Sequence, residues 1–356
     1  MFFKILLDRK MVCVLLIIFL IVLLTLVGCG KPSEKEVFEL TLAHFQPPVH
    51  EVETVLIQGW IKAIEEATDG RVKITSYPGG TLIPGTEIYE GVVDGAADIG
   101  HSCYAYTRGR FPVLETLLVP GLQWPNAKVA DWVQMDLIKE LNPDELKDVK
   151  HLFSWTTGRG DLLTKVPVER KEDLSGLEIG VTAGERADAL RRLGASGVVL
   201  PMPEQYEAIS RGLTKGVVAP METLKSFRLA EVVDHVTITP MLYNQLLFMV
   251  MNLDKWNSLP PDIQNIIEKV TEDYYEEVVA GFYDWLAELV FEWLAQEGIE
   301  LEIIYLSKEE EERWVNDIKP LLDNHIKYLN DKGLPGQEIY NTTLKIIEKN
   351  TEIYGN

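Results

Sequence analysis

The stretch HLFSWTTGRGDLLTKVPVERKEDLSGLEIGVTAG, residues 151–184, decides the expected fold. It reads as a strand at His151–Trp155, a break at TTGRG, and a second strand at Leu177–Val181, after which a helical pattern starts at Glu185. In open α/β sheets, a strand that ends at a helix start presents backbone N–H groups to a ligand. We therefore expect this stretch to form one wall of a ligand cleft and the crossing point between two lobes.

Two arginines mark this wall as a candidate site for an anion. Arg159 lies in the TTGRG break, and Arg186 lies in the first turn of the helix that follows the second strand. An arginine offers its donors in a planar fork that matches the two oxygens of a carboxylate. The two arginines therefore suit a ligand whose carboxylate is buried in the cleft.

The composition indicates a soluble globular protein with enough chain for two domains of ordinary size. The chain has 356 residues, of which 46% are hydrophobic and 25% are charged. Its formal net charge is −21, so no basic stripe is available to displace counterions from a nucleic acid. An anionic small molecule remains compatible with this charge, because local donors decide its binding.

The N-terminus has the pattern of a secretory signal. Basic residues precede a nearly unbroken apolar run at Met11–Val27, which stops at Gly28 and Cys29. The sequence Leu-Val-Gly-Cys resembles a bacterial lipobox, so we predict a lipoprotein signal peptide at 1–28, lipid attachment at Cys29 and a tether at 29–36. An uncleaved N-terminal anchor is the rival interpretation, since the apolar run is marginal for a membrane span. Both interpretations place the body outside the cytoplasm and hold it at the membrane.

The body predicts a mostly parallel sheet with helices on its faces. Strand and helix patterns alternate in the order β-α-β-α-β, at Phe38–Ala43, Glu51–Thr68, Arg71–Tyr77, Glu87–Asp94 and Asp98–His101. We expect a further helix at Asn126–Leu141 and further strands at Val149–Trp155, Gly197–Leu200, Thr214–Pro220, Val232–Ile238 and Tyr243–Met251. The last of these strands is expected to return to the first lobe.

We therefore predict an α/β fold of two lobes, in which parallel or mixed sheets are flanked by helices and joined at a hinge. Lobe I is assigned residues 37–157 and 247–285, and lobe II residues 158–246 and 286–356. A helical pattern from Pro261 to about Glu297 is long enough to lie across both lobes. A coiled coil is the rival for this helix, but its apolar positions lack a strict seven-residue repeat. The C-terminal part is expected to add two helices against the second lobe.

Motifs of common catalytic sites are absent from the sequence. It has no HExxH, no GxSxG elbow, no Walker loop and no GxGxxG after a strand. The body has one cysteine, Cys103, which we interpret as a small packed residue. We expect no catalytic site, no metal ion and no cofactor. An extracytoplasmic hydrolase is the minority hypothesis, and it would need a nucleophile and a base in the cleft.

Eight runs of sequence carry a family resemblance. Between about Val37 and Ile267 they are, in order, LAHFQPP (42–48), GRVKITSYPGGTL (70–82), GVVDGAADIGHSCYAYTRGRFP (91–112), WTTGRGDLLTKVPV (155–168), EDLSGLEIGV (172–181), PMPEQYEAI (201–209), METLKSFRLAEVV (221–233) and NLDKWNSLPPDIQ (252–264). Each run alone is a weak signal, but their order is highly specific. Together they resemble the substrate-binding proteins of TRAP transporters, the DctP-type family.

This resemblance implies a two-lobed periplasmic-binding-protein architecture with a long helix spanning both lobes. It implies that the lobes close on a small organic acid and deliver it to a membrane permease of two unequal subunits, driven by an ion gradient. The family typically holds the ligand carboxylate with an arginine in a strand of the LKIRV type. Here that strand reads LEIGV, with Gly180 at the arginine's position. The usual salt bridge therefore cannot form from residue 180.

Two interpretations of the ligand remain open. In one, Arg159 binds the carboxylate in place of the family arginine, with help from Arg186. In the other, the ligand is neutral or aromatic and stacks on tyrosines. In either case Gly180 leaves room for a bulkier ligand, and Glu222 would accept a hydrogen bond from a ligand hydroxyl or help to hold a cation. A ligand-sensing lobe for a membrane receptor is an alternative to transport.

The predicted ligand site gathers residues from strand ends and the loops that follow them. Its members are His44, Phe45, Tyr89, Tyr104, Tyr106, Thr157, Arg159, Gly180, Arg186, Met221, Glu222, Tyr243 and Asn244. Tyr89, Tyr104, Tyr106 and Tyr243 are the residues assigned to stacking.

Overall fold

A computed structural model describes residues 36–355, and Phe38–Asn356 form one compact unit. The predicted signal peptide at 1–28, the lipid-attachment residue Cys29 and the tether as far as residue 35 lie outside the described residues. No helix within 36–355 is long and apolar enough to cross a membrane.

The first sheet has the strand order β2-β1-β3-β10-β4. Its strands are β1 (Phe38–His44), β2 (Val72–Tyr77), β3 (Ile99–Cys103), β4 (Val149–Thr156) and β10 (Leu246–Asn252). β1 runs parallel to β2 and β3, whereas β10 runs antiparallel to β3 and β4. The predicted return of a late strand to the first sheet is therefore confirmed.

Helices cover both faces of this sheet. They are η1 (Val52–Ile57), α2 (Gln58–Ala67), α3 (Ile88–Val93), α4 (Ala127–Leu141), α8 (Leu253–Ser258) and α9 (Pro261–Tyr274). Along β10, Leu247 and Met249 pack with α2 and α9, while Phe248 and Val250 pack with α3 and α4. A strand buried on both faces needs an unbroken apolar run, which explains the sequence LLFMVM.

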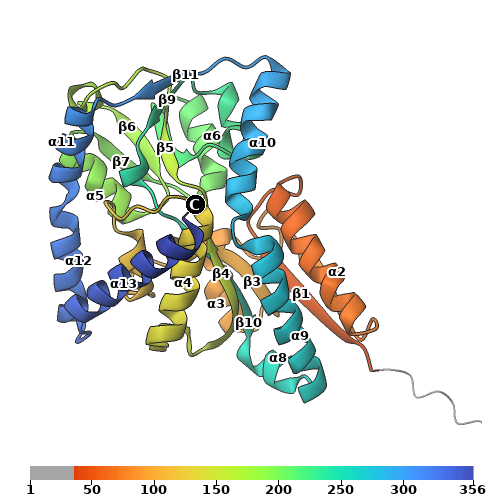
Figure 1. The fold of residues 1–356 in the computed structure, drawn as a ribbon. Coiled ribbons are helices and arrows are strands. Elements are labelled where there is room, and N and C mark those ends of the chain that lie inside the picture. Colours follow the sequence, from red (N-terminus) through yellow and green to blue (C-terminus); the bar gives the residue numbers. More distant parts are fainter. Residues whose placement is uncertain (1–35, 356) are drawn as a thin grey trace, which may run out of the picture. The chain divides into compact units, whose positions relative to one another are not determined.

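The second sheet has the strand order β11-β9-β5-β8-β6-β7. Its strands are β5 (Gly160–Thr164), β6 (Glu178–Val181), β7 (Ser196–Val199), β8 (Gly216–Pro220), β9 (His235–Ile238) and β11 (Glu302–Tyr305). One face packs against α5 (Gly184–Leu193) and α11 (Lys308–Ile318), and the other against α6 (Met202–Ser210) and α10 (Phe282–Glu297). The predicted α/β fold with two sheets is confirmed, and Figure 1 shows both sheets with their helices.

Short helical turns and small helices connect these elements. They are η2 (Gly85–Glu87), η3 (Tyr104–Tyr106), η4 (Leu114–Leu118), η5 (Asp144–Leu146), η6 (Lys171–Leu174), α7 (Thr223–Ser226), η7 (Leu229–Glu231) and η8 (Pro240–Leu242). The chain passes from the first sheet to the second after β4, returns after β9, and passes again after α9. Three segments of the chain therefore cross between the two sheets.

The long helix is present but bent. Where the sequence predicted one helix from Pro261 to Glu297, the structure has α9, a π-turn at Tyr275–Val279 and then α10. Gly281, at the break, has a φ of 92°, a conformation that glycine adopts without steric cost. Its freed N–H donates to Asp131 Oδ2 at 2.8 Å. The prediction that the helix spans both lobes is confirmed, but its continuity was wrong.

The C-terminal segment also differs from the prediction. It forms three helices, α11, α12 (Pro320–Asp331) and α13 (Gly336–Tyr354), rather than two. α13 packs against α4 of the first lobe instead of the second lobe, and Figure 1 shows the two helices together. Ile346 of α13 joins the apolar cluster on that face, and Asn126 Nδ2 donates to Tyr354 O at 2.9 Å. Assigning the whole of 286–356 to lobe II was therefore wrong for α13.

Candidate functional site

An inner cavity of about 20 Å³ lies between the two lobes. The first lobe contributes Phe45, Gln46, Cys103, Tyr106, Leu247 and Tyr283, and the second contributes Thr182, Met202, Pro220, Glu222, Thr223 and Phe227, with Thr157, Tyr243 and Gln245 from the crossings. Many of these residues directly follow the carboxyl ends of β1, β3, β6 and β8. Parallel strands gather their carboxyl ends at one edge, where ligands of open α/β sheets bind.

Direct contacts between the lobes lie close to this cavity. Met202 N donates to Tyr106 Oη at 2.9 Å, and Lys225 Nζ donates to Glu51 Oε1 at 2.6 Å. The volume holds about one water molecule. A larger molecule would therefore need the lobes to move apart.

An outer cavity of about 280 Å³ adjoins the inner one. The two cavities share Thr157, Pro220, Glu222 and Tyr283 in their walls. Arg159 and Met221 line only the outer cavity, whose wall also includes α10 residues as far as Phe291. Glu222 thus lies between the two cavities and lines both of them.

Arg186 lies directly behind the wall of the inner cavity. Its side chain is 1% exposed, and its guanidinium stacks over the Tyr243 ring at 4.2 Å. Nη1 donates to Thr182 Oγ1 at 2.7 Å, and Nη2 donates to Gln245 Oε1 at 2.6 Å and to Asn244 O. Nε has no hydrogen-bond partner. Within residues 36–355 no carboxylate lies at ion-pair distance from this guanidinium, so a buried cation faces only neutral acceptors.

Burial of this cation carries an electrostatic cost. Burial lowers the pKa of Arg186 from its ordinary value, because the low-dielectric surroundings disfavour the charged form. An arginine side chain nevertheless stays protonated in proteins. A buried charge that keeps its proton and lacks a counter-ion is expected where an anionic ligand supplies the missing charge.

Gly180 does not leave space for a bulkier ligand, which corrects the sequence interpretation. The residue is buried in β6, and a Cβ built on it would lie 1.9 Å from Gln205 Oε1. Gln205 is itself fully buried and donates through Nε2 to Leu200 O at 2.9 Å. The side chain of Gln205 therefore occupies the position from which an arginine at residue 180 would extend.

Replacing Gly180 with alanine should lower the melting temperature, because the new methyl group collides with Gln205. Overpacking of this kind costs about 1–3 kcal/mol. Shortening the neighbour in the double variant Gly180→Ala/Gln205→Ala should recover part of this loss, so that the two changes are not additive. Thermal unfolding of both single variants and the double variant measures the coupling. Strict additivity would show that the two side chains do not compete for one space.

Arg159 is less available to a ligand than the sequence suggested. Its side chain is 57% exposed and its Nε lies 3.7 Å from Asp161 Oδ2, so it already has a carboxylate partner. Burial raises the pKa of Asp161 to about 6, and Arg159 opposes this rise. Arg159 thus lines the outer cavity, whereas Arg186 lies behind the wall of the inner one. The two arginines that the sequence treated as partners therefore do not meet at one cavity.

Tyr89 and Tyr104 are core residues, which corrects their assignment as stacking surface. Both are buried, and both pack edge-on against Phe111 and Phe248. Tyr89 Oη donates to Glu145 O at 3.1 Å, while Tyr104 Oη and Ser154 Oγ lie 2.9 Å apart. Neither ring lines the inner or the outer cavity. Of the four predicted tyrosines, Tyr106 and Tyr243 do line the inner cavity.

His44 and Asn244 support the cleft from behind its wall. His44 is buried, and its Nε2 lies 2.9 Å from Glu53 Oε2 and 3.2 Å from Ser76 Oγ. Asn244 Nδ2 donates to Leu122 O at 3.1 Å, and its backbone oxygen accepts from Arg186. Neither side chain lines a cavity of the cleft, because both point into polar contacts within the fold.

Several wall residues were missed by the sequence prediction. Cys103, which we interpreted as a packed residue, is buried but also lines the inner cavity, at the end of β3. Thr182 and Gln46 follow β6 and β1 by one or two residues, so the strand-end rule could have found them. Phe227 and Tyr283 come from the helical segments around α7 and α10 and carry no such signal.

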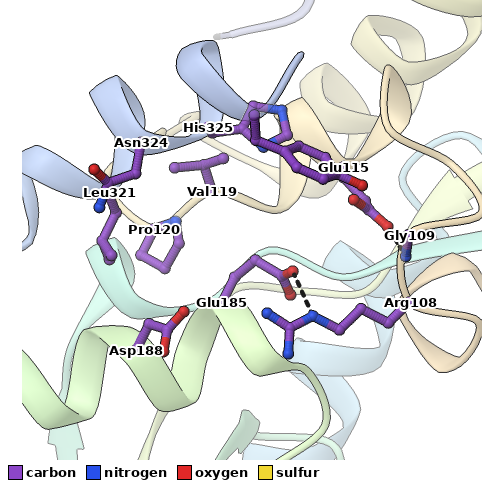
Figure 2. A pocket seen from close by; sticks show the side chains of 11 residues that line it. Arg108, Gly109, Glu115, Val119, Pro120, Glu185, Asp188, Leu321, Asn324 and His325 are labelled. Atoms are coloured by element: carbon purple, nitrogen blue, oxygen red, sulfur yellow. Dashed lines mark hydrogen bonds and ion pairs between the residues drawn. The ribbon is translucent and has the colours of Figure 1, made fainter. Parts of the chain in front are cut away.

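A separate cavity of about 360 Å³ lies between the segment at residues 108–120, α5 and α12. Figure 2 shows Glu185 facing Arg108, with Asp188 on the same helix as Glu185 and Glu115 on the far side of the cavity beside Gly109. The Arg108 Nε to Glu185 Oε1 distance is 3.9 Å. Three carboxylates and one arginine make this lining unsuitable for an organic acid. Across residues 36–355 no group of three or more metal-binding side chains is gathered.

Comparisons with known proteins identify the family. The DctP family model, described as bacterial extracellular solute-binding protein, family 7, matches residues 42–328. The 2,3-diketo-L-gulonate-binding periplasmic protein YiaO of Escherichia coli (strain K12) is 27% identical over 207 residues, which cover 57% of this chain and 63% of YiaO. The chain is thus matched over less than two thirds of that relative.

Two solved structures of TRAP periplasmic solute-binding proteins are similar throughout. One, from Desulfovibrio salexigens DSM2638 in an open complex, has a TM-score of 0.76 and 28% identity, covering 88% of this chain and 96% of its own. The other, from Bordetella bronchiseptica with bound (R)- and (S)-mandelate, has a TM-score of 0.78 and 28% identity, covering 87% and 99%. The chain therefore belongs to the DctP family of bacterial extracellular solute-binding proteins, and the TRAP-type resemblance of its motifs is confirmed.

Proposed function

We propose that this protein is the solute-binding component of a TRAP-type uptake system and that its ligand is a small organic acid. The acid binds in the interlobe cleft and passes unaltered to a membrane permease of two unequal subunits. The observation that carries the proposal is Arg186, a buried cation without a counter-ion directly behind the wall of the inner cavity. An acid that enters between the lobes would supply the missing charge.

The surroundings of Arg186 favour a carboxylate. Nε is free to donate, and the neighbouring Thr182 hydroxyl and Gln245 amide already line the inner cavity. The helix α5 starts at Gly184, two residues before Arg186, and Ala183 provides no side-chain cap. Its uncapped N–H groups add a positive end of the helix dipole. Fork-shaped donation from arginine to a carboxylate is the strongest orienting contact that such a site can offer.

The ligands of the relatives point in the same direction. The E. coli relative is a binding protein for 2,3-diketo-L-gulonate, and the B. bronchiseptica protein holds mandelate. Both molecules are carboxylates, and mandelate carries an aromatic ring. The inner cavity of this chain has aromatic walls in Phe45, Phe227 and Tyr243, so a ring-bearing acid suits it.

The protein's position in the cell follows from the same proposal. Lipid attachment at Cys29, with residues 29–36 as tether, would hold the body outside the cytoplasm close to the permease. A binding protein of this kind performs no chemistry on its ligand, which fits the absence of catalytic motifs from the sequence.

Acid binding should stabilise the protein, and the charge on the acid should be required. Purified wild-type protein is expected to melt at a higher temperature with mandelate or benzoate, but not with mandelamide or benzamide. A ligand at 100 times its Kd adds roughly 2.7 kcal/mol, enough to raise Tm by about 5 °C. The amides match the acids in shape but are neutral, and they replace one acceptor oxygen with an NH2 donor. Equal shifts with acid and amide would contradict the proposal.

A further inference from the structure

The carboxylate of Glu222 provides a hydrogen-bond acceptor in the wall of the inner cavity. Its side chain is nearly buried, its Oε2 accepts from Ser226 Oγ at 2.5 Å, and it lies in the walls of both the inner and the outer cavity. Throughout residues 36–355 no lysine or arginine makes an ion pair with it. Its nearest basic neighbour is His50, whose Nε2 lies 3.6 Å from Oε2.

His50 presents a hydrogen-bond donor beside this carboxylate. The backbone N–H of Val52 donates to His50 Nδ1 at 3.0 Å, so Nδ1 is unprotonated and the neutral ring carries its proton on Nε2. This nitrogen is fully buried and has no hydrogen-bond partner. The gap of 3.6 Å to Glu222 is too long for a direct bond. A donor and an acceptor therefore stand side by side, and neither satisfies the other.

A second acceptor, this one without a partner, lies in the same cavity wall. Gln46 is 3% exposed, and its Oε1 is buried without a partner. Buried polar atoms in native proteins are almost always paired, so unpaired ones that face a cavity indicate where ligand atoms bind. Gln46 and Glu222 thus place two acceptors in the cavity wall, and the unpaired His50 Nε2 lies behind Glu222 at 3.6 Å from its Oε2.

The rest of the cavity wall is aromatic. Phe45 and Tyr106 pack edge-on at 5.5 Å, and Phe227 stacks edge-on against His50 at 5.7 Å. The Tyr243 ring lies against the Arg186 guanidinium. Flat apolar walls between a cationic group and a carboxylate suit a ligand with a planar apolar body.

We propose that the ligand is an aromatic monocarboxylic acid that carries a hydroxyl group, and that Glu222 and His50 recognise this hydroxyl. The inference rests on the proposed function, in which Arg186 binds the carboxylate. A hydroxyl donates its proton to Glu222 and accepts from the N–H of His50, so it satisfies both groups at once. An ether or ketone cannot donate to Glu222, and an ammonium group cannot accept from His50.

The experiment compares matched acids on wild type and variants by titration calorimetry. The probes are benzoate, 3- and 4-hydroxybenzoate, and the corresponding methoxybenzoates, which keep the oxygen but lose the donor. Wild-type protein should bind one hydroxybenzoate at least about tenfold more tightly than benzoate and its methoxy counterpart, in line with one discriminating hydrogen bond. In Glu222→Leu that preference should disappear.

Two further variants separate recognition from structure. Glu222→Gln should lose most of the preference and keep the shape of the wall, and Glu312→Gln, exposed on α11, should behave as wild type. Benzoate binding without any preference for a hydroxyl would overturn the inference and leave the proposed function standing. An equal loss of affinity for all the acids in Glu222→Leu would also overturn the inference, because Glu222 would then support the structure of the site and not recognise the hydroxyl. Failure of every acid to bind wild type would overturn both.

Discussion

Replacing Arg186 with methionine should remove at least about 99% of the affinity for the acid while leaving the unliganded protein close to wild-type stability. Charge-assisted hydrogen bonds contribute about 1.5–3 kcal/mol each, so a carboxylate held by two of them loses about 3 kcal/mol or more. This energy corresponds to a change in Kd of at least about 100-fold.

The stability of the unliganded variant distinguishes a binding residue from a structural one. Arg186 donates to Thr182, Asn244 and Gln245, and methionine would leave these three acceptors without that partner. Methionine also removes a buried cation that has no counter-ion, which relieves a desolvation penalty of several kcal/mol. The two effects oppose each other, so we expect only a small change in Tm. A conserved Tm together with lost affinity cannot arise from a purely structural arginine.

Two controls keep this prediction open to contradiction. Arg186→Lys retains the charge without the planar fork and should bind with intermediate affinity. Arg159→Met removes the exposed arginine that already pairs with Asp161, and it should bind the acid within about threefold of wild type. A strong loss of affinity in Arg159→Met with none in Arg186→Met would show that the ligand carboxylate binds in the outer cavity instead.

Replacing Asp131 with alanine should lower the free energy of unfolding by about 3 kcal/mol or more. This carboxylate on α4 is 1% exposed; its Oδ1 accepts from Thr156 N at 2.6 Å and Thr156 Oγ1 at 2.9 Å, and its Oδ2 accepts from Gly281 N. Burial raises the pKa of Asp131 to about 7, which three donors oppose. Each buried donor left unpaired costs about 1–3 kcal/mol.

The position of these donors makes the loss specific to the hinge. Thr156 ends β4 at the first crossing between the lobes, and Gly281 marks the bend between α9 and α10 at the last. Thermal unfolding should show a lower Tm for Asp131→Ala, and Asp131→Asn should fall between it and wild type because one oxygen acceptor remains. Asp136→Ala is a matched control on the same helix, since Asp136 pairs near the surface with Lys349 and Asn350. Equal losses at positions 131 and 136 would contradict the role of Asp131.

Periodicity in the sequence predicted the sheets well. The alternation in FELTLA and the unbroken run LLFMVM each reflect how many faces of a strand are buried, and burial is recorded in local sequence. The helix break at Gly281 could not be predicted in this way, because an isolated glycine inside a helical pattern is also compatible with an unbroken helix. The packing of α13 on α4 depends on contacts between distant segments, which an amphipathic pattern does not specify.

The candidate site was predicted less completely, for a physical reason. Arg159 and Arg186 are indistinguishable as residues near strand ends, and only the fold shows that one is exposed and paired while the other is buried and unpaired. Tyr89 and Tyr104 likewise have the same chemistry as Tyr106 and Tyr243, yet they face the core and not the cleft. Side-chain direction was the missing information.

The contact between Gly180 and Gln205 limits how this binding site could change over evolutionary time. A single substitution that introduces arginine at residue 180 would drive its Cβ into the Gln205 amide. A lineage could therefore adopt the family's usual anchor only if the Gln205 side chain moved aside or was exchanged for a smaller one. In sequences related to this chain, positions 180 and 205 should therefore covary. Where the side chain does not move aside, substitution of Gln205 by a smaller residue would have to precede the introduction of arginine at 180.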